Sequence, residues 1–260
     1  ISVNTIENNI ELITKELSDN SYSALIETNS EGDIIREYPV NNLQDCFVSD
    51  TKIYYIARKD ELYKLYTISD SIQTETKISY PTENKIYYRL AVDENNRIVI
   101  YTSNEQGDSK LDFYDSDYSF IQSKSIESLS SFLFHDNRLY YTDNLNLYYT
   151  DNELNICKSD IDFNIFGSNP TFSQGNDEYS FLFSNDEGVF GYKSDIGKYD
   201  KLLDFYKEGT DKLSRTFFLN NKSELIMCNS YSLFKAVFQN ASEKEIINIA
   251  VFPDELYSND

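Results

Sequence analysis

The side chains of this sequence that could do chemistry are mainly carboxylates. The chain has 44 Asp and Glu residues against 23 Lys and Arg. Six of them follow short apolar runs at matching points of the sequence and form the candidate binding set: Asp60, Glu105, Asp108, Asp143, Asp186 and Glu187. Carboxylate oxygens and backbone carbonyls are the ligands that hard cations such as Ca²⁺ prefer, at six to eight per ion. No Asp-rich loop with calcium-binding spacing is present, and hairpin turns favour Asp and Asn in any case. Calcium therefore stays an open alternative, and we assign no metal site or other cofactor.

Other catalytic groups are scarce. The chain has one histidine, His135, so a metal centre with several histidine ligands cannot form. Neither a G-x-S-x-G elbow nor a phosphate-binding glycine loop occurs. The three cysteines, Cys46, Cys157 and Cys228, are far apart and form no CxxC pair, so we expect three free thiols on separate strands. These shortages favour a protein that is not an enzyme.

The net charge of −21 limits the partners. Nucleic acids and anionic membranes bind proteins through clustered Lys and Arg, and this sequence has no such cluster. No stretch reaches the roughly 18 apolar residues of a membrane-spanning helix, so we expect no membrane insertion. With 40% hydrophobic residues the chain can form a real core.

A repeat of about 43 residues positions the candidate carboxylates. Short apolar runs end at markers spaced 43, 45, 40, 42 and 44 residues apart: Ile13, Ile56, Tyr101, Tyr141, Phe183 and Met227. Regular repeats of this length are typical of arrays of one supersecondary unit. The runs are short, rich in Ile, Tyr, Phe and Val, and bounded by turn residues, which predicts strands. The predicted second strands of the six units are residues 10–13, 53–56, 98–101, 139–141, 181–183 and 225–227.

Each unit contains further strands around its marker. A preceding run predicts a first strand at residues 46–48, 88–92, 131–134, 171–173 and 216–219, and two more runs follow each marker. Four strands joined by tight turns make an antiparallel meander. Adjacent tyrosines such as Tyr54 and Tyr55 must point to opposite faces of a strand, which suits packing between neighbouring sheets. With only six alanines few helices are expected, and Leu202–Lys207 is one short helical segment that the pattern allows.

The sequence LYYTDN occurs at residues 139–144 and again at 147–152, and IYYIARKDELYKLYTIS spans 53–69. These segments resemble the YWTD-like six-bladed propellers, in particular bacterial relatives with Tyr in place of Trp. Trp is absent here, and the similarity is close over about two of the six repeats. The resemblance and the repeat together predict an all-β fold: a β-propeller of six four-stranded blades around a central channel. We expect one domain over residues 1–260, either as a whole chain or as a module cut from a longer one.

Two ways of closing such a ring are open. Residues 1–6 fall where the first strand of the first blade is expected, whereas residues 250–257 could return beside that blade and clasp it. We favour a self-contained six-blade ring.

Radial symmetry would collect the turns that follow the second strands on one face, around the channel mouth. The six candidate carboxylates would then form a negative ring that attracts a cationic small molecule or a basic protein surface. We therefore expect a monomeric, non-catalytic ligand- or protein-binding module of a bacterial cell-surface or secreted protein. The alternative is a metal-dependent enzyme of the lactonase or lyase kind, in which channel carboxylates hold one divalent cation as a Lewis acid.

Overall fold

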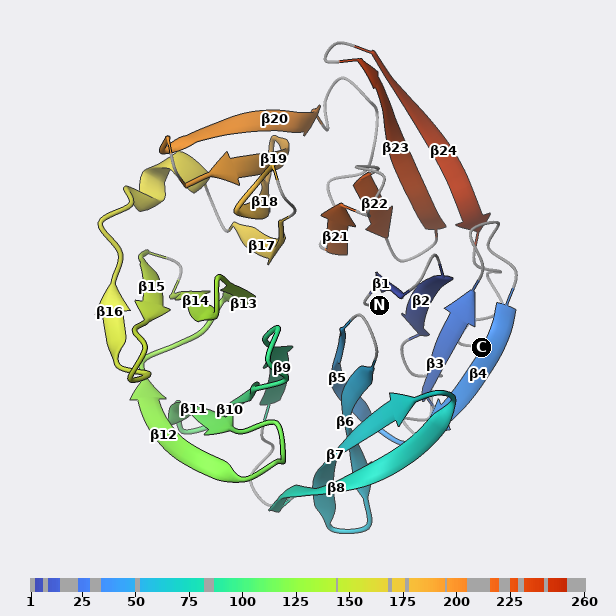
Figure 1. Cartoon of the computed structure of the whole chain (residues 1–260), viewed down its shortest axis with the longest axis vertical. Helices are drawn as coiled ribbons and strands as arrows, with labels where there is room; N and C mark the ends of the chain where they lie inside the picture. Colours follow the sequence, from blue (N-terminus) through green and yellow to red (C-terminus); the bar gives the residue numbers. More distant parts are fainter. Residues whose placement is uncertain are drawn as a thin grey trace. The chain divides into compact units, whose positions relative to one another are not determined.

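In the part of the chain that the computed structural model describes, twenty-four strands form six antiparallel sheets (Figure 1). The structure describes residues 3–6, 9–14, 23–28, 34–49, 52–81, 87–143, 145–167, 170–175, 178–194, 196–204, 216–219, 225–228, 232–240 and 243–251. Within these ranges there is no α-helix, and the one helical element is the short 3-10 helix η1 (Phe163–Phe166). Contacts divide the chain into two compact units, 1–127 with 249–260 and 128–248.

The first unit holds three sheets. Sheet A consists of β1 (Val3–Ile6), β2 (Asn9–Thr14), β3 (Ser23–Thr28) and β4 (Ile34–Val40). Sheet B consists of β5 (Leu43–Val48), β6 (Ile53–Lys59), β7 (Leu62–Ser69) and β8 (Ile72–Pro81). Sheet C consists of β9 (Tyr87–Val92), β10 (Ile98–Ser103), β11 (Ser109–Tyr114) and β12 (Phe120–Ile126).

The second unit holds two complete sheets and most of a third, because residues 249–251 at the end of β24 fall in the first unit. Sheet D consists of β13 (Ser131–His135), β14 (Arg138–Thr142), β15 (Leu147–Thr150) and β16 (Ile156–Lys158). Sheet E consists of β17 (Thr171–Gln174), β18 (Phe181–Asn185), β19 (Gly188–Lys193) and β20 (Lys198–Asp204). Sheet F consists of β21 (Thr216–Leu219), β22 (Leu225–Cys228), β23 (Ser232–Asn240) and β24 (Glu243–Val251).

Every sheet is built from four strands that are consecutive in the chain and paired in chain order. The predicted markers all lie on second strands, and their registers correspond: Ile56 pairs with Asp45, Tyr101 with Arg89, and Tyr141 with Phe132. The predicted first and second strands are therefore confirmed, with small differences at their ends. The N-terminal expectation also holds, because β1 pairs with β2 as the first strand of sheet A.

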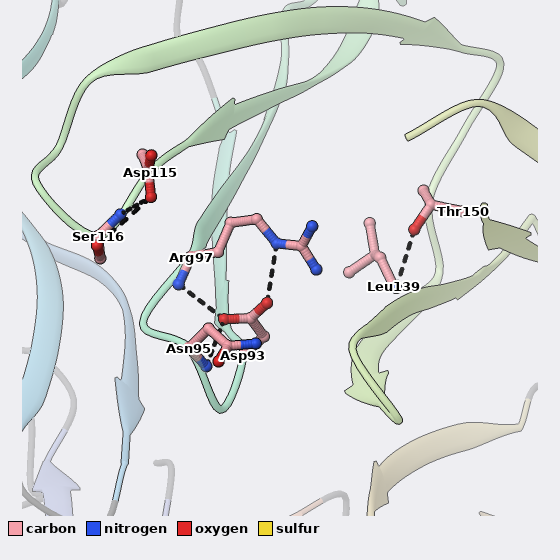
Figure 2. Close-up of polar contacts among 7 residues, drawn as sticks. All are labelled: Asp93, Asn95, Arg97, Asp115, Ser116, Leu139 and Thr150. Carbon is pink, nitrogen blue, oxygen red and sulfur yellow. Dashed lines mark hydrogen bonds and ion pairs between the residues drawn. The ribbon is translucent and has the colours of Figure 1, made fainter. Parts of the chain in front are cut away.

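A recurring hairpin turn joins several of these strands. The turn begins at four positions: Asp93, Asn104, Asp115 and Asp151. In each, the carbonyl of the first residue accepts the N–H of the residue three positions later, and the N–H of the first residue donates to the carbonyl of the residue four positions later. The fourth residue of each turn has a positive φ, which belongs to a type I turn followed by a G1 bulge. The first side chain adds further bonds: Asp93 accepts the N–H groups of Asn95 and Arg97, and Asp115 accepts that of Ser116 (Figure 2).

Tyrosines on opposite faces of sheet B connect it to both neighbouring sheets of the first unit. Tyr54 and Tyr55 are adjacent in β6, and both are fully buried. Tyr54 packs with residues of sheet C such as Ile98, whereas Tyr55 packs with residues of sheet A such as Leu25. The predicted alternation of tyrosine pairs is thus confirmed at this strand.

Phe166 is the aromatic centre of the second unit. It ends η1, is completely buried, and its ring lies 4.9 Å from that of Phe183 and 5.1 Å from that of Phe172. The Asn185 side-chain amide donates to the Phe166 carbonyl at 3.0 Å and fixes the end of the helix. This cluster links sheets D and E, because Leu133 and Leu147 belong to it as well.

Two expectations need correction or limits. The helical segment that the pattern allows at Leu202–Lys207 is wrong over residues 202–204, which are the end of β20. Leu203 and Asp204 pair with β19, and Leu202 is the extra residue of a bulge; residues 205–207 lie outside the described ranges. Cys46 and Cys157 are free thiols as expected. Cys228 lies in β22, but its side chain is outside the described set, as are residues 252–257 of the proposed clasp.

Candidate binding site

Sheets B and C pack face to face with their corresponding ends together. At one end the Tyr54 hydroxyl of β6 donates to Asn96 Oδ1, in the turn between β9 and β10, at 2.8 Å. At the other end the Tyr80 hydroxyl of β8 reaches β11, where it donates to Asp112 Oδ2 at 3.0 Å. Tyr80 pairs with Tyr63, just after the β6–β7 turn. These two contacts bring the β6–β7 and β10–β11 turns to the same end of the sheet pair.

The three candidate carboxylates of the first unit lie at that end. Asp60 is exposed in the β6–β7 turn with a φ of 55°. Glu105 and Asp108 are exposed in the β10–β11 turn, where the Asn104 side-chain amide donates to Asp108 Oδ2 at 3.0 Å. The second–third strand turns therefore carry these residues as the sequence indicated.

The candidate carboxylates of the second unit also share one end of their sheets. Asp143 follows β14, and both Asp186 and Glu187 lie between β18 and β19. The N–H of Phe172 in β17 donates to the Ser131 hydroxyl of β13 at 3.1 Å, and both residues lie at the strand ends next to these turns. This bond sets sheets D and E with their corresponding ends together.

The carboxylate of Asp143 holds its own turn. It accepts the N–H groups of Leu145 and Asn146 and the Tyr148 hydroxyl, the last at 2.9 Å. Partial burial acts to raise the pKa of Asp143, but these hydrogen bonds outweigh it, and the net pKa is lowered. Asp143 is thus a structural residue, whereas Asp186 and Glu187 are exposed and Glu187 lies 3.6 Å from Lys201 Nζ.

The described residues bring no metal-binding cluster together, as they contain no group of three His, Cys, Asp or Glu side chains placed to hold an ion. Within each unit the candidate carboxylates share an end of their sheets but do not converge on one point. His135 ends β13 beside the turn to β14, with its Nε2 3.3 Å from Asp136 Oδ2. Within the described ranges no helix has the length and apolar character to cross a bilayer.

A buried polar cluster that the sequence did not indicate lies under the turns of sheets B and C. Its centre is Asp112 on β11, only 2% exposed. Asp112 Oδ2 accepts the Tyr80 hydroxyl and lies 2.9 Å from Lys110 Nζ. The Tyr114 hydroxyl is 2.7 Å from that of Tyr80, and since Tyr80 donates to Asp112, Tyr114 donates to Tyr80. Burial, together with the nearby Tyr114 and Asp112, raises the pKa of Tyr80 far above its ordinary value.

Two atoms of this region have no hydrogen-bond partner among the described residues, Asp112 Oδ1 and the Tyr88 hydroxyl. Tyr88 is 3% exposed, and its ring lies 4.8 Å from that of Tyr63 and 5.5 Å from that of Tyr80. Leaving a buried polar atom unpaired costs about 1–3 kcal/mol, and more for a charged group. The cluster therefore combines unmet hydrogen-bonding capacity with aromatic walls.

A partly buried carboxylate joins the first strands of sheets B and C. Asp45 lies at a bulge of β5, and its Oδ2 accepts the N–H of Leu90 in β9 at 2.7 Å. Burial is the main cause that raises the pKa of Asp45 to about 6, against the opposing effects of Arg89 and the backbone N–H groups.

The gap between sheets D and E is less suited to a ligand. It is lined by Ser131, Tyr140, Thr142, Phe172 and Phe181, among others, and leaves no room for a water-sized sphere. The Thr142 hydroxyl has no partner within the described ranges. We place no site here.

Sequence reasoning identified the turn carboxylates but missed Asp112, Tyr80 and Tyr88. A weak signal for Asp112 exists: it is a charged residue in the middle of the strand Lys-Leu-Asp-Phe-Tyr, where alternation puts it on the same face as Lys110 and Tyr114. Its partner Tyr80 is 32 residues away on another sheet, so the pairing itself leaves no local pattern.

Comparison with known proteins shows which fold the chain has. The sequence matches no protein-family model and no curated protein. In structure, the chain is similar to the β-propeller domain of the Trilobed protease from Pyrococcus furiosus, with a TM-score of 0.59 and 10% identity over 98% of both chains. It is also similar to virginiamycin B lyase from Staphylococcus aureus, with a TM-score of 0.58 and 14% identity over 95% of this chain and 83% of the lyase.

A third similar structure is the SapL1 lectin in complex with alpha methyl fucoside, with a TM-score of 0.58 and 9% identity over 97% of this chain and 96% of the lectin. At these identities the similarity shows the fold alone. The all-β chain therefore has a β-propeller fold, and its structural neighbours include both enzymes and a lectin.

Proposed function

We propose that this chain is a non-catalytic binding module, a six-bladed propeller that takes a cationic ligand or a basic protein surface at the sheet ends bearing the second–third strand turns. The observation that carries the proposal is the exposure of Asp60, Glu105, Asp108, Asp186 and Glu187 at these ends. In a chain with a net charge of −21, such a surface attracts cations and speeds their encounter.

The six-bladed ring is part of this proposal. Six four-stranded sheets supply six blades, and each takes all its strands from one continuous segment. Closure would then depend on packing between sheets, without a strand exchanged between the chain ends. The similar propeller domain from Pyrococcus furiosus has an open velcro topology, which is a precedent for such closure. The YWTD-like segments lie in β6–β7 and β14–β15, at corresponding positions of sheets B and D.

The bacterial, extracellular or cell-surface location and the monomeric state remain part of the proposal. The bacterial source rests on the resemblance to bacterial YWTD-like propellers. The similar lectin, solved with alpha methyl fucoside, gives a precedent for a ligand-binding propeller of this size.

A pair of triple variants tests the location of the binding surface. The turn variant carries Asp60→Asn, Glu105→Gln and Asp186→Asn, all in second–third strand turns. The control carries Asp70→Asn, Glu94→Gln and Glu153→Gln, exposed residues in turns at the opposite ends of their sheets. Each variant changes the net charge equally. Asp60 and Asp70 both have positive φ, a conformation that Asn accepts readily.

The probe is a hexalysine peptide, with binding measured by calorimetry at low and at physiological salt. We expect the turn variant to bind roughly threefold or more weakly, since exposed charge pairs contribute about 0.2–1 kcal/mol each. The loss of binding free energy in the control should be less than half of that in the turn variant. Equal losses in the two variants would show that the peptide responds only to net charge, and the proposed surface would be wrong.

A divalent-metal titration distinguishes the enzymatic alternative from the non-catalytic binding module. The similarity to virginiamycin B lyase shows that this fold can support lyase chemistry. Stoichiometric Ca²⁺ or Zn²⁺ binding at micromolar concentration, with turnover that depends on it, would replace the non-catalytic proposal.

A further inference from the structure

We propose that Asp112 and the tyrosines around it form a recognition site for a primary ammonium group, and that the chain's own Lys110 occupies this site in the free protein. This inference rests on the proposed function, because it names the chemical group of the cationic partner. The site lies between sheets B and C, under the β6–β7 and β10–β11 turns.

Lys110 shows that the site accepts an ammonium. Its Nζ lies 2.9 Å from Asp112 Oδ2 and 5.9 Å from the centre of the Tyr80 ring. A carboxylate combined with the face of an aromatic ring is a favourable environment for a cation. The Tyr114–Tyr80–Asp112 chain of hydroxyl hydrogen bonds holds the carboxylate in place.

The site has binding capacity that Lys110 leaves unused. Asp112 Oδ1 and the Tyr88 hydroxyl, both on almost completely buried side chains, have no partner among the described residues. A primary ammonium carries three N–H donors, whereas the structure records one oxygen, Asp112 Oδ2, within reach of Lys110 Nζ. An ammonium on a chain free of the backbone of β11 can turn its remaining donors toward Oδ1 and Tyr88.

Lys110 is also placed to leave. Its side chain is 47% exposed, whereas that of Asp112 is 2% exposed, so solvent reaches the lysine side chain but hardly that of Asp112. Lys110 directly follows Ser109 at the end of the β10–β11 turn, where Glu105 and Asp108 are exposed. These carboxylates draw cations toward the entrance and provide an acidic surrounding for the displaced lysine.

Exchange of one ammonium for another leaves the charge of the buried site unchanged. The energetic problem of a buried, unpaired carboxylate therefore does not arise in the bound state. The incoming group gains the hydrogen bonds that Lys110 does not make. A neutral ligand would have to leave Asp112 without its counter-ion, so the site selects ammonium over hydroxyl compounds.

Removal of Lys110 tests the site. The probes are cadaverine, as a free amine, and the peptide acetyl-Gly-Lys-Gly-amide, as a lysine side chain on a backbone, each titrated by calorimetry. Lys110→Met should bind at least one of them about tenfold or more tightly than the unmodified chain, since a hydrogen bond to a charged group is worth about that factor. The probe that binds tells whether a small amine or a partner's lysine is the source.

The controls separate this site from general charge effects. Lys158→Met, at an exposed lysine of β16, changes the net charge equally and should leave probe affinity unchanged. Lys110→Met combined with Asp112→Asn should abolish the gain, and combination with Tyr88→Phe should reduce it severalfold. Lys110→Gln, which can still donate to Asp112, replaces the Met variant if circular dichroism shows that the latter is unfolded.

Failure to bind either probe after removal of Lys110 would overturn the inference and leave water as the partner of Asp112 Oδ1. Equal gains in Lys110→Met and Lys158→Met would overturn it as well, as would a gain that survives Asp112→Asn. None of these results affects the proposed function, because hexalysine binding at the turns is measured with Lys110 and Asp112 unchanged.

Discussion

Replacement of Phe166 by alanine should strongly destabilise the second unit. The side chain is completely buried, and its ring contacts five others, of Phe163, Phe172, Phe181, Phe183 and Tyr192, with centroids 4.9–5.9 Å apart. Burial of an aromatic side chain removes about 150–250 Å² from water, which at about 25 cal/mol per Å² is worth roughly 4–6 kcal/mol. Measured losses for buried Phe→Ala changes are about 3–5 kcal/mol, in agreement.

The assay is thermal and urea unfolding followed by circular dichroism. For a chain of this size each kcal/mol lowers the melting temperature by about 2–4 °C, so we expect a decrease of roughly 6–20 °C. Phe163→Ala is the matched control, because Phe163 lies in the same short helix but is only half-buried, and the one ring contact recorded for it is with Phe166. A Phe166→Ala chain that loses less than about 1 kcal/mol, or no more than the Phe163→Ala chain, would refute the assignment of Phe166 as the centre of this core.

Three further predictions address other parts of the chain. The pKa of Asp45 is raised to about 6, so the folded state favours the protonated carboxyl; this contribution to stability is complete below about pH 4 and is lost as the pH rises through 6. Urea unfolding should therefore show Asp45→Asn more stable than the unmodified chain above pH 6, by up to roughly 3 kcal/mol, and equal to it near pH 4. A difference that stays constant with pH would contradict this. A Cβ at Gly191 would lie 2.3 Å from Cδ1 of Tyr179, so Gly191→Ala should cost about 1–3 kcal/mol in unfolding free energy, and a double-mutant cycle that shows no relief by Tyr179→Ala would disprove the contact. Thiol titration of the denatured, unreduced protein should give three free cysteines per chain, and a value of one would reveal a disulfide.

Local sequence features allowed much of the fold to be predicted. The markers such as Ile56 and Tyr101 lie on second strands because short runs of β-branched and aromatic residues suit a strand, and Asp, Asn and Gly between them suit tight hairpins. Both signals act over a few residues, so the chain displays them directly. The same reasoning placed the candidate carboxylates Asp60 and Asp186 in turns.

Local patterns failed where pairing between strands outweighed intrinsic preference. The apolar pair Leu202–Leu203 fits a helical turn as well as a strand, and only the pairing of β20 with β19, in which Leu203 lies opposite Val189, decides for a strand. The bulge beside Val189 adjusts the register so that both leucines are buried. The role of Asp143 was missed in a similar way, because its sequence position is that of the other turn carboxylates and only the hydrogen bonds that it accepts from Leu145, Asn146 and Tyr148 distinguish it.

The sequence by itself determined the repeat, the strands, the turns and the acidic character, because each depends on composition or on neighbours along the chain. Only the tertiary structure decided which side chains meet across sheets. Asp112 finds Tyr80, Asp45 finds Leu90, and Phe166 finds Phe183, across separations of 32, 45 and 17 residues. Alternation along a strand tells which face a residue is on, but the partner on the facing sheet depends on how two twisted surfaces pack. The buried site at Asp112 exists because that packing brings a carboxylate, a lysine and several tyrosines together.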